Sequence, residues 1–308
     1  MNNQTIEQYC RSACESIGVT YKAVLADGQF HTADLSNDSK GKNDGRIKIF
    51  LDQQGGIVFN NKSGEQQSFF INRKAGEPIQ AIDYEHIHRE QQRRKIEQQA
   101  AYDKAAHKAL ALWKIAKPAT ENHPYLVNKQ VKAHGLRLAP WLRSFKDDDG
   151  NYQKLTIDNC LILPLYNAEG ELRSLQAIFP EHNPTLDRNK DFMPRGAMAG
   201  LFWWIGAKST TVLIAEGFAT AASLYEQTGY RVYMAMTANN LLAVGRIVRE
   251  KLPTHDIIFC ADNDTKTPVN AGLTKSTAAA LEIEGGVIAP PISGDFNDYV
   301  NYLREVRP

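Results

Sequence analysis

The stretch TVLIAEGFATAASLYEQTG, Thr211–Gly229, places two different periodicities side by side. TVLIA is a short apolar run typical of a buried strand, whereas FATAASLYEQT is rich in helix-forming residues. A lone carboxylate, Glu216, and a glycine, Gly217, stand at the junction between them. The order of strand, acid and helix predicts an α/β unit in which the acid lies at the end of a strand.

The same alternation continues to the end of the chain. Two further strand-helix pairs follow, YRVYMAMTA with NNLLAVGRIVREKL and HDIIFCADND with NAGLTKSTAAALEIEG. A last apolar piece, GVIAPPI, precedes GDFNDYVNYLREV. Apolar strands that alternate with helices predict a parallel sheet covered on both faces. We therefore expect a parallel sheet flanked by helices over residues 207–308.

Three further regions precede this unit. Residues 1–80 predict a small β-rich module with one helix, Thr5–Ile17, followed by short strands separated by turn residues. Residues 81–118 predict one long helix, which contains eight Lys and Arg and five acids. This helix is either a solvated linker or a surface that lies along a nucleic-acid backbone. Residues 119–206 predict an α+β subdomain with a hairpin that turns at 167–170.

Composition limits the classes of protein that fit. The chain has 308 residues, 36 Lys and Arg against 35 Asp and Glu, and a net charge of +1, so its overall charge gives no attraction to nucleic acid or membrane. Cys10 and Cys14 are one helical turn apart and are interpreted as a reduced thiol pair rather than half of a zinc site. No signal peptide and no apolar run of about 20 residues is present, which predicts a cytoplasmic protein without a membrane partner.

Several carboxylates are expected at one edge of the parallel sheet. Glu216 ends one strand, Asp262 and Asp264 end another, and Asp295 and Asp298 follow the last apolar piece. The carboxyl ends of parallel strands share an edge, and acids gathered there repel one another unless a cation lies among them. A hard divalent ion with oxygen ligands fits such a site and suits phosphoryl or nucleotidyl transfer. Alternatively, Glu216 contacts helix amides and the aspartates form turns.

EGFATA, 216–221, resembles the EGYATA signature of primases carried by phages and conjugative plasmids, within the Toprim domain of primases, topoisomerases and some nucleases. ADND and GDFNDY fall where that family has its aspartates. HPYL, the hairpin sequence LPLYNAEGELRSLQAIFP and the segment at Lys190 resemble the part that precedes Toprim in these primases. The resemblance covers most of the chain and is strongest after His123.

The resemblance implies roles for the acids. Glu216 is the general base or a metal-positioning acid, and Asp262 and Asp264 are the principal ligands of Mg²⁺ or Mn²⁺. Asp295 or Asp298 completes the metal shell.

It also implies a basic groove, in which Lys190 and Arg195 hold the template or a nucleoside triphosphate. The alternative for these two residues is an ordinary solvated loop charge. Gly217 is expected because a side chain there would obstruct the tight turn into the helix, and it is also a candidate substrate-binding residue.

Two departures from the family stand out. Residues 1–120 lack the spacing of a zinc ribbon, so the template must be read in another way, for which the β-rich module is a candidate. Thr220 occupies a position where replicative primases carry an acid.

The prediction is a DNA-dependent primase that makes short primers on single-stranded DNA from nucleoside triphosphates, for phage or plasmid replication. Because no Walker motif occurs in this sequence, unwinding is expected from a separate helicase or another part of the polypeptide. A Toprim nuclease or nickase uses the same acids with water as the nucleophile. A non-catalytic single-stranded-DNA-binding accessory protein is the other alternative. Its candidate stacking residues, which are more often core residues, are Trp113, Trp141, Trp203, Trp204 and Tyr125.

Overall fold

The computed structural model describes residues 5–38, 43–71, 83–146, 151–265 and 270–306. The chain forms two compact units, Met1–Gln98 and Gln99–Pro308, and each is described by itself. The finer division into the four segments that the sequence predicts remains a proposal.

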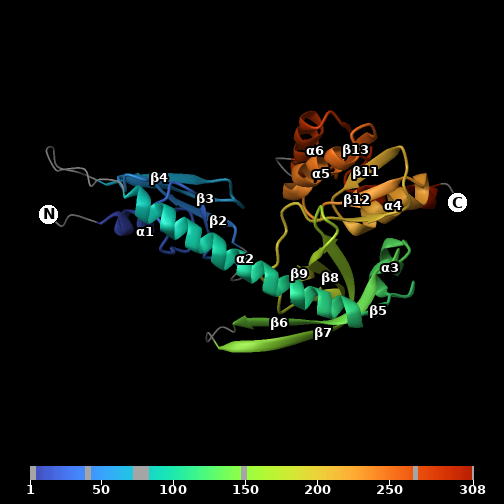
Figure 1. Cartoon of the computed structure of the whole chain (residues 1–308), viewed down its shortest axis with the longest axis horizontal. Helices are drawn as coiled ribbons and strands as arrows, with labels where there is room; N and C mark the ends of the chain where they lie inside the picture. Colours follow the sequence, from blue (N-terminus) through green and yellow to red (C-terminus); the bar gives the residue numbers. More distant parts are fainter. Residues whose placement is uncertain (1–4, 39–42, 72–82, 147–150, 266–269, 307–308) are drawn as a thin grey trace. The chain divides into compact units, whose positions relative to one another are not determined.

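The first unit packs one helix on an antiparallel sheet (Figure 1). Helix α1, Ile6–Ser16, begins at Thr5, whose hydroxyl accepts from the Gln8 amide while the Gln8 side chain accepts from the Thr5 amide. This capping box stabilises the start of the helix. Cys10 and Cys14 are free, buried thiols in the core between helix and sheet, as the sequence predicts. The strands, in sheet order, are β1 (His31–Ala33), β2 (Gly45–Ile49), β3 (Gly55–Asn60) and β4 (Gln66–Phe70).

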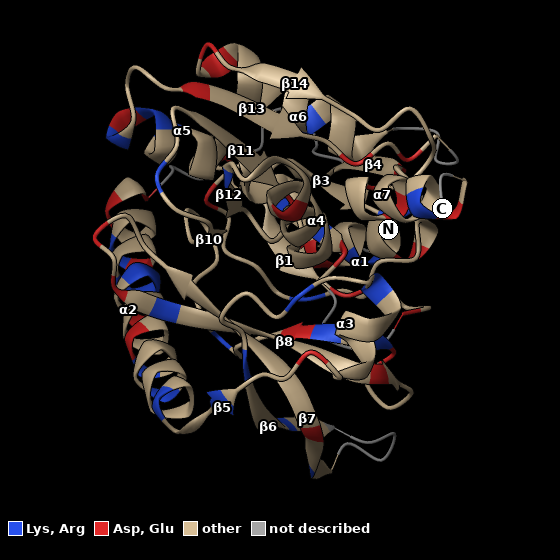
Figure 2. Cartoon of the chain, turned by 90° about the vertical axis from the view of Figure 1, so that its right-hand side faces the viewer, with Lys and Arg blue, Asp and Glu red and all other residues tan. Residues whose placement is uncertain are grey.

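The long helix is confirmed as α2, Tyr84–Ile115. Figure 2 shows basic and acidic residues interleaved along it, and Arg93 pairs with Glu90 and Glu97 on its exposed surface. Buried alanines such as Ala109 join the second unit's core near the helix end. No helix in the described part of the chain, α2 included, is long and apolar enough to cross a membrane.

The second unit begins with an antiparallel sheet that contains the predicted hairpin. Strands β7 and β8 pair around a turn closed by a hydrogen bond from the Gly170 amide to the Asn167 carbonyl, 3.1 Å. Gly170 adopts φ +81°, a conformation that glycine adopts without steric cost. The elements are β5 (Lys117–Pro118), α3 (Pro124–Lys129), β6 (Arg137–Lys146), β7 (Tyr152–Tyr166), β8 (Leu172–Asn183) and β9 (Arg188–Phe192).

The C-terminal sheet has the order β10-β12-β11-β13-β14. Strands β11 to β14 are parallel, as the alternating pattern predicts, but β10 pairs with β12 in the antiparallel direction. The sheet is therefore mixed rather than wholly parallel, because a strand from the preceding antiparallel region covers its edge. The strands are β10 (Trp203–Ile205), β11 (Thr211–Ala215), β12 (Arg231–Met234), β13 (Asp256–Cys260) and β14 (Gly286–Ile288). The helices are α4 (Phe218–Thr228), α5 (Leu241–Lys251), α6 (Ala271–Glu282) and α7 (Phe296–Val306), with a 3₁₀ turn at Ala238–Asn240.

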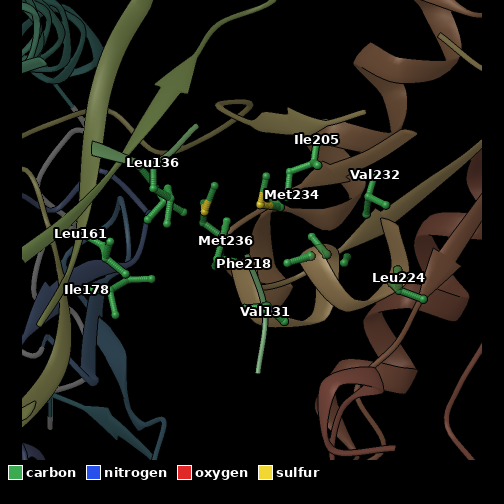
Figure 3. Close-up of a cluster of buried hydrophobic side chains, with 14 of the residues drawn as sticks. Val131, Leu136, Leu161, Ile178, Ile205, Phe218, Leu224, Val232, Met234 and Met236 are labelled. Atoms are coloured by element: carbon green, nitrogen blue, oxygen red, sulfur yellow. The ribbon is translucent and has the colours of Figure 1, made fainter. Parts of the chain in front are cut away.

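One apolar core joins the two sheets of the second unit. In Figure 3, Leu136, which directly precedes β6, and Leu161 and Ile178 of the antiparallel sheet face Phe218 and Met236 of the C-terminal sheet region. Burial of this apolar surface holds the antiparallel sheet against the carboxyl edge of the C-terminal sheet. Among the tryptophans, Trp141 is buried, Trp203 and Trp204 pack against cores, and Trp113 stacks under Arg137, which favours their interpretation as structural residues.

Candidate active site

Glu216 and Asp262 lie at the carboxyl ends of two adjacent parallel strands. Ala215, the last residue of β11, is the cross-strand partner of Cys260, the last residue of β13. Glu216 follows Ala215 directly, and Asp262 lies two residues beyond Cys260. The strand register therefore brings these two acids to one edge of the sheet, as the sequence pattern predicts.

The acids at this edge disfavour one another's ionisation. Burial, with the neighbouring charges of Glu216, Asp295 and Asp264, raises the pKa of Asp262 to about 7, against a weaker opposing effect of Lys190. Burial also raises the pKa of Glu216, although Lys190 and a hydrogen bond from the Ala238 backbone oppose the shift. Among the described residues no donor reaches the buried Oδ1 atom of Asp262. The edge thus carries more negative charge than its protein neighbours balance.

Lys190 reaches this edge from the antiparallel sheet. It lies on β9, and its ammonium interacts with the charges of Asp295, Glu216 and Asp262. Burial is the largest cause that lowers the pKa of Lys190, and the nearby Lys129 lowers it further. Lys190 is therefore a partly desolvated cation beside the carboxylates rather than a solvated loop charge.

The strand that carries Lys190 is held by its neighbour Asp191. This buried carboxylate accepts from Trp141 Nε1 at 2.9 Å and pairs with Arg143 at 3.1 Å and Arg188 at 3.2 Å. A buried carboxylate that accepts from Trp141 and Arg188 and lies beside a second arginine anchors the strand firmly. Asp191 therefore restricts the position of Lys190.

Asp295 and Asp298 meet the site through the start of α7. Asp295 Oδ1 accepts from the Asp298 amide at 2.9 Å, and Asp298 Oδ2 accepts from the Asp295 amide at 3.1 Å. This reciprocal pair is a capping box built from two aspartates. The Thr220 hydroxyl donates to Asp295 Oδ2 at 3.1 Å, whereas Asp298 is half exposed and lies 3.6 Å from Lys129 Nζ. Asp295 thus faces the sheet edge that carries Glu216 and Asp262, whereas Asp298 caps the start of α7.

A loop contact joins the end of β13 to the segment before α7. Asn263 forms an isolated bridge with Gly294, and its side chain donates to the carbonyls of Pro290 and Ile292. Asp264 follows in an exposed position. Asn263 therefore holds the two aspartate-bearing loops next to each other.

Comparison with known proteins identifies the C-terminal region. Residues 211–303 match the model of the Toprim domain. The chain carries a Toprim domain. The matched range spans the strand ends that bear Glu216, Asp262 and Asp264 and the helix start that bears Asp295 and Asp298.

The chain as a whole is similar to two DNA primases of Escherichia coli. It is 26% identical over 295 residues to the DNA primase TraC of Escherichia coli, with 92% of this chain and 26% of that protein aligned. A second Escherichia coli DNA primase TraC is 25% identical over 298 residues, with 92% of this chain and 19% of that protein aligned. The chain thus spans about a quarter or less of the length of these relatives. A DNA primase domain from Pseudomonas aeruginosa aligns with a TM-score of 0.42 and 14% identity, over 66% of this chain and 74% of that one.

The reason predicted for Gly217 in the Toprim domain is wrong. A Cβ atom at this position would meet nothing within 4 Å, and its φ of −110° is accessible to other residues. Gly217 is the N-cap of α4 and gives no side-chain cap, so the space beside Glu216 stays open. The glycine leaves room at the helix start rather than relieving a backbone clash.

Arg195 occupies a different environment from Lys190. It is exposed, with φ +60°, in a turn in which the Gly196 amide donates to the Met193 carbonyl at 2.9 Å. With Pro194 before it, this is the geometry of a type II turn, in which glycine is the usual residue at the position of Arg195. Lys190 lies close enough to the acids to interact with their charges, whereas Arg195 has no ion pair among the described residues.

Tyr125 is a site residue that sequence reasoning placed in another role. Burial raises the pKa of its hydroxyl, and the charge of Asp295 raises it further. The Lys190 ammonium lies 5.9 Å from the centre of its ring. In the sequence, the HPYL segment was the feature that could have pointed to Tyr125. Only the packing of α3 against the Toprim domain shows that Tyr125 lies beside the acids.

The Toprim acids suit a divalent ion in charge and in ligand type. An unpartnered buried oxygen of Asp262 and the raised pKa values of Asp262 and Glu216 indicate a deficit of positive charge at this edge. In the part of the chain that the structure describes, no three His, Cys, Asp or Glu side chains are close enough to enclose an ion as they stand. Carboxylates with water as additional ligands fit the way Mg²⁺ binds.

Proposed function

We propose that this chain is the catalytic part of a DNA primase, which joins nucleoside triphosphates into short primers on single-stranded DNA for plasmid or phage replication. The observation that supports it most is the buried, unpartnered oxygen of Asp262 beside Glu216 and Lys190 at the edge of a Toprim domain. Similarity to TraC primases over 92% of the chain supports the same activity.

In this proposal Asp262, with Glu216 and Asp264, holds Mg²⁺ or Mn²⁺, and Asp295 contributes from α7. The bound metal supplies electrostatic stabilisation of the phosphate that is transferred. Asp298 is the weakest of the five candidate ligands because it already caps α7 and lies near Lys129.

Glu216 and Lys190 have complementary tasks. The raised pKa of Glu216 makes it a better proton acceptor for the 3′ hydroxyl that attacks the α-phosphorus of the incoming nucleotide. Lys190 offers a partly desolvated positive charge to the triphosphate, from which pyrophosphate leaves. The open space beside Gly217 leaves room for these groups. Arg195, exposed in its turn, is proposed as a contact to the template backbone rather than to the reacting phosphates.

The test is primer synthesis with single-stranded DNA, labelled nucleoside triphosphates and Mg²⁺. We expect short products from the wild type and a loss of at least about 100-fold in Glu216→Gln and in the Asp262→Asn/Asp264→Asn double variant. Asp187→Asn is the matched control, because Asp187 is an exposed acid of the same unit whose partner is His182. Circular dichroism checks that every variant is folded.

Two results would contradict the proposal. Cleavage of the DNA instead of synthesis, lost in the same variants, would assign a Toprim nuclease. Binding of DNA with neither product in any condition would assign a non-catalytic accessory protein.

A further inference from the structure

The sheet of the first unit has one face that none of its described helices covers. Cross-strand partners share a face, so Ile49, Gly56 and Phe69 point to α1 and the core. The intervening positions, such as Lys48 and Ile57, point to the opposite side. The start of α2 lies on the core side, where it lines a cavity with Ile49 and α1 residues. We call the opposite side the open face, and its residues used here are Phe30, Arg46, Lys48, Phe50, Phe59 and Phe70.

Aromatic rings are exposed on the open face. Phe30 is 50% exposed and Phe70 is 62% exposed, although both are large apolar side chains. The ring centres of Phe50 and Phe70 are 6.1 Å apart, so they form one patch. Exposed aromatic residues that cluster on one surface mark a binding site more often than isolated ones do.

A glycine positions Phe70 on the sheet surface. Gly55 is the cross-strand partner of Phe70, and a Cβ atom on Gly55 would lie 2.7 Å from Phe70 Cδ1. The ring therefore occupies the space that a side chain at position 55 would fill, while most of the Phe70 side chain stays exposed. An exposed ring whose place depends on a neighbouring glycine is available for stacking on another planar group.

Basic groups accompany these rings. The Lys48 ammonium lies 5.5 Å from the centre of the Phe30 ring and 6.0 Å from that of Phe50. Arg46 and Phe59 are direct cross-strand partners on the same face. Lys48 and Arg46 give the patch positive charge, which attracts anions that carry planar groups.

We propose that the open face binds single-stranded DNA, with bases stacked on Phe30 and Phe70 and phosphates near Lys48 and Arg46. Single strands expose the flat sides of their bases, whereas a duplex hides them, and aromatic platforms with interspersed cations are the usual way to bind them. The inference extends the proposed primase function by a template contact remote in sequence from the catalytic acids. It does not depend on catalysis and can be tested without it.

The experiment measures binding of the full chain to a fluorescent oligothymidylate by anisotropy, in EDTA and without nucleotides. We expect the Phe30→Ala/Phe70→Ala double variant to bind at least about tenfold more weakly, with the salt dependence of its affinity unchanged. Lys48→Ala should bind more weakly and show a reduced salt slope. Photo-crosslinks from an iodouracil-substituted oligonucleotide should map to the strands β2 to β4.

Two matched controls separate the face from general surface effects. Lys62→Ala removes a cation of the same module that pairs with Asp38 at 2.5 Å. Tyr302→Ala removes an exposed aromatic side chain, 47% exposed, from α7. Both should bind as the wild type does, and thermal melts should show that all variants are folded.

The proposal is overturned if the double variant binds within twofold of the wild type and the crosslinks lie elsewhere. It is also overturned if the wild type is a dimer that the double variant dissociates, because the face would then be an interface between copies. Failure of the catalytic proposal gives a different result. In that case, the open-face variants still lose DNA affinity although neither wild type nor Glu216→Gln makes primers.

Discussion

Asp262 is the residue in which the conflict between folding and the proposed function is clearest. Its carboxyl group is buried at the end of β13 beside Glu216 and Asp295, and these surroundings raise its pKa to about 7. An unfolded aspartate ionises near pH 3.8, the ordinary value for this side chain. The folded protein therefore retains a proton that the unfolded chain has released between about pH 4 and 7.

This difference predicts a pH-dependent stability. In EDTA, the contribution of Asp262 to the free energy of unfolding should fall as pH rises from 4 to 7, because over this range the unfolded aspartate binds less proton than the folded one. Asp262→Asn has no carboxyl group to ionise, so its free energy of unfolding should exceed that of the wild type by about 2 to 4 kcal/mol at pH 8 and equal it at pH 4. Urea unfolding at the two pH values measures this free energy. The control Asp187→Asn should have the free energy of unfolding of the wild type at both pH values.

Mg²⁺ supplies the second arm of this experiment. At pH 8, Mg²⁺ should stabilise the wild type by binding the folded state, and it should stabilise Asp262→Asn less. Equal stability of the wild type and Asp262→Asn at every pH would show that Asp262 ionises normally in the folded chain.

At the scale of elements, the start of α7 lies at the sheet edge that carries Glu216 and Asp262. Asp295 and Asp298 cap one another, and Thr220 of α4 donates to Asp295. Near the site, Asn297 Nδ2 donates to the Lys129 carbonyl at 2.7 Å and to Ser223 at 2.9 Å. The position of Asp295 is thus determined by two helices and the end of α3.

The capping geometry predicts different consequences for the two aspartates of α7. Asp298→Ala should lower the free energy of unfolding by about 1 kcal/mol, the usual cost of a lost capping contact, and leave primer synthesis within a few-fold of wild type. Thermal unfolding and the primer assay measure both quantities. Glu305→Ala, at the exposed opposite end of α7, is the control and should change neither. A loss of activity as large as that of the Asp262 variant at unchanged stability would instead make Asp298 a metal ligand.

At the scale of the whole molecule, the two compact units have separate cores. In the first unit, Ile47 and Val58 pack against α1, and in the second, Leu163 lies in the core that joins the two sheets. The sequence predicts four segments instead, and the boundary between the two units lies within one of them, the long helix over 81–118.

Separate cores predict separate unfolding transitions. Ile47→Ala should lower the free energy of unfolding of the first unit by about 2 to 4 kcal/mol, because its side chain is fully buried. Leu163→Ala should lower that of the second unit by a similar amount for the same reason. Differential scanning calorimetry resolves the two. A single transition that both substitutions shift equally would show that the units unfold together.

Local pattern was sufficient to predict much of this protein. The strand and helix periods of Thr211–Gly229 and the segments after it predicted the α/β sheet, and Glu216 and Asp262 could be assigned to one edge. This works because parallel strands bring their carboxyl ends to the same edge whatever the details of packing. The long helix and the hairpin at 167–170 were predictable for a different reason, since each depends on contacts between residues close in sequence.

Tertiary structure decided what local pattern could not. The antiparallel strand β10, the desolvated Lys190 and the placement of Tyr125 all depend on how the antiparallel sheet packs against the Toprim domain. The aromatic open face likewise depends on strand register, which brings Gly55 under Phe70. Sequence periodicity determined the elements and their polar ends, whereas long-range apolar burial determined which side chains of different elements meet. The free energy of that burial depends on the apolar area removed from water and not on the order of residues along the chain, so a local pattern does not specify it.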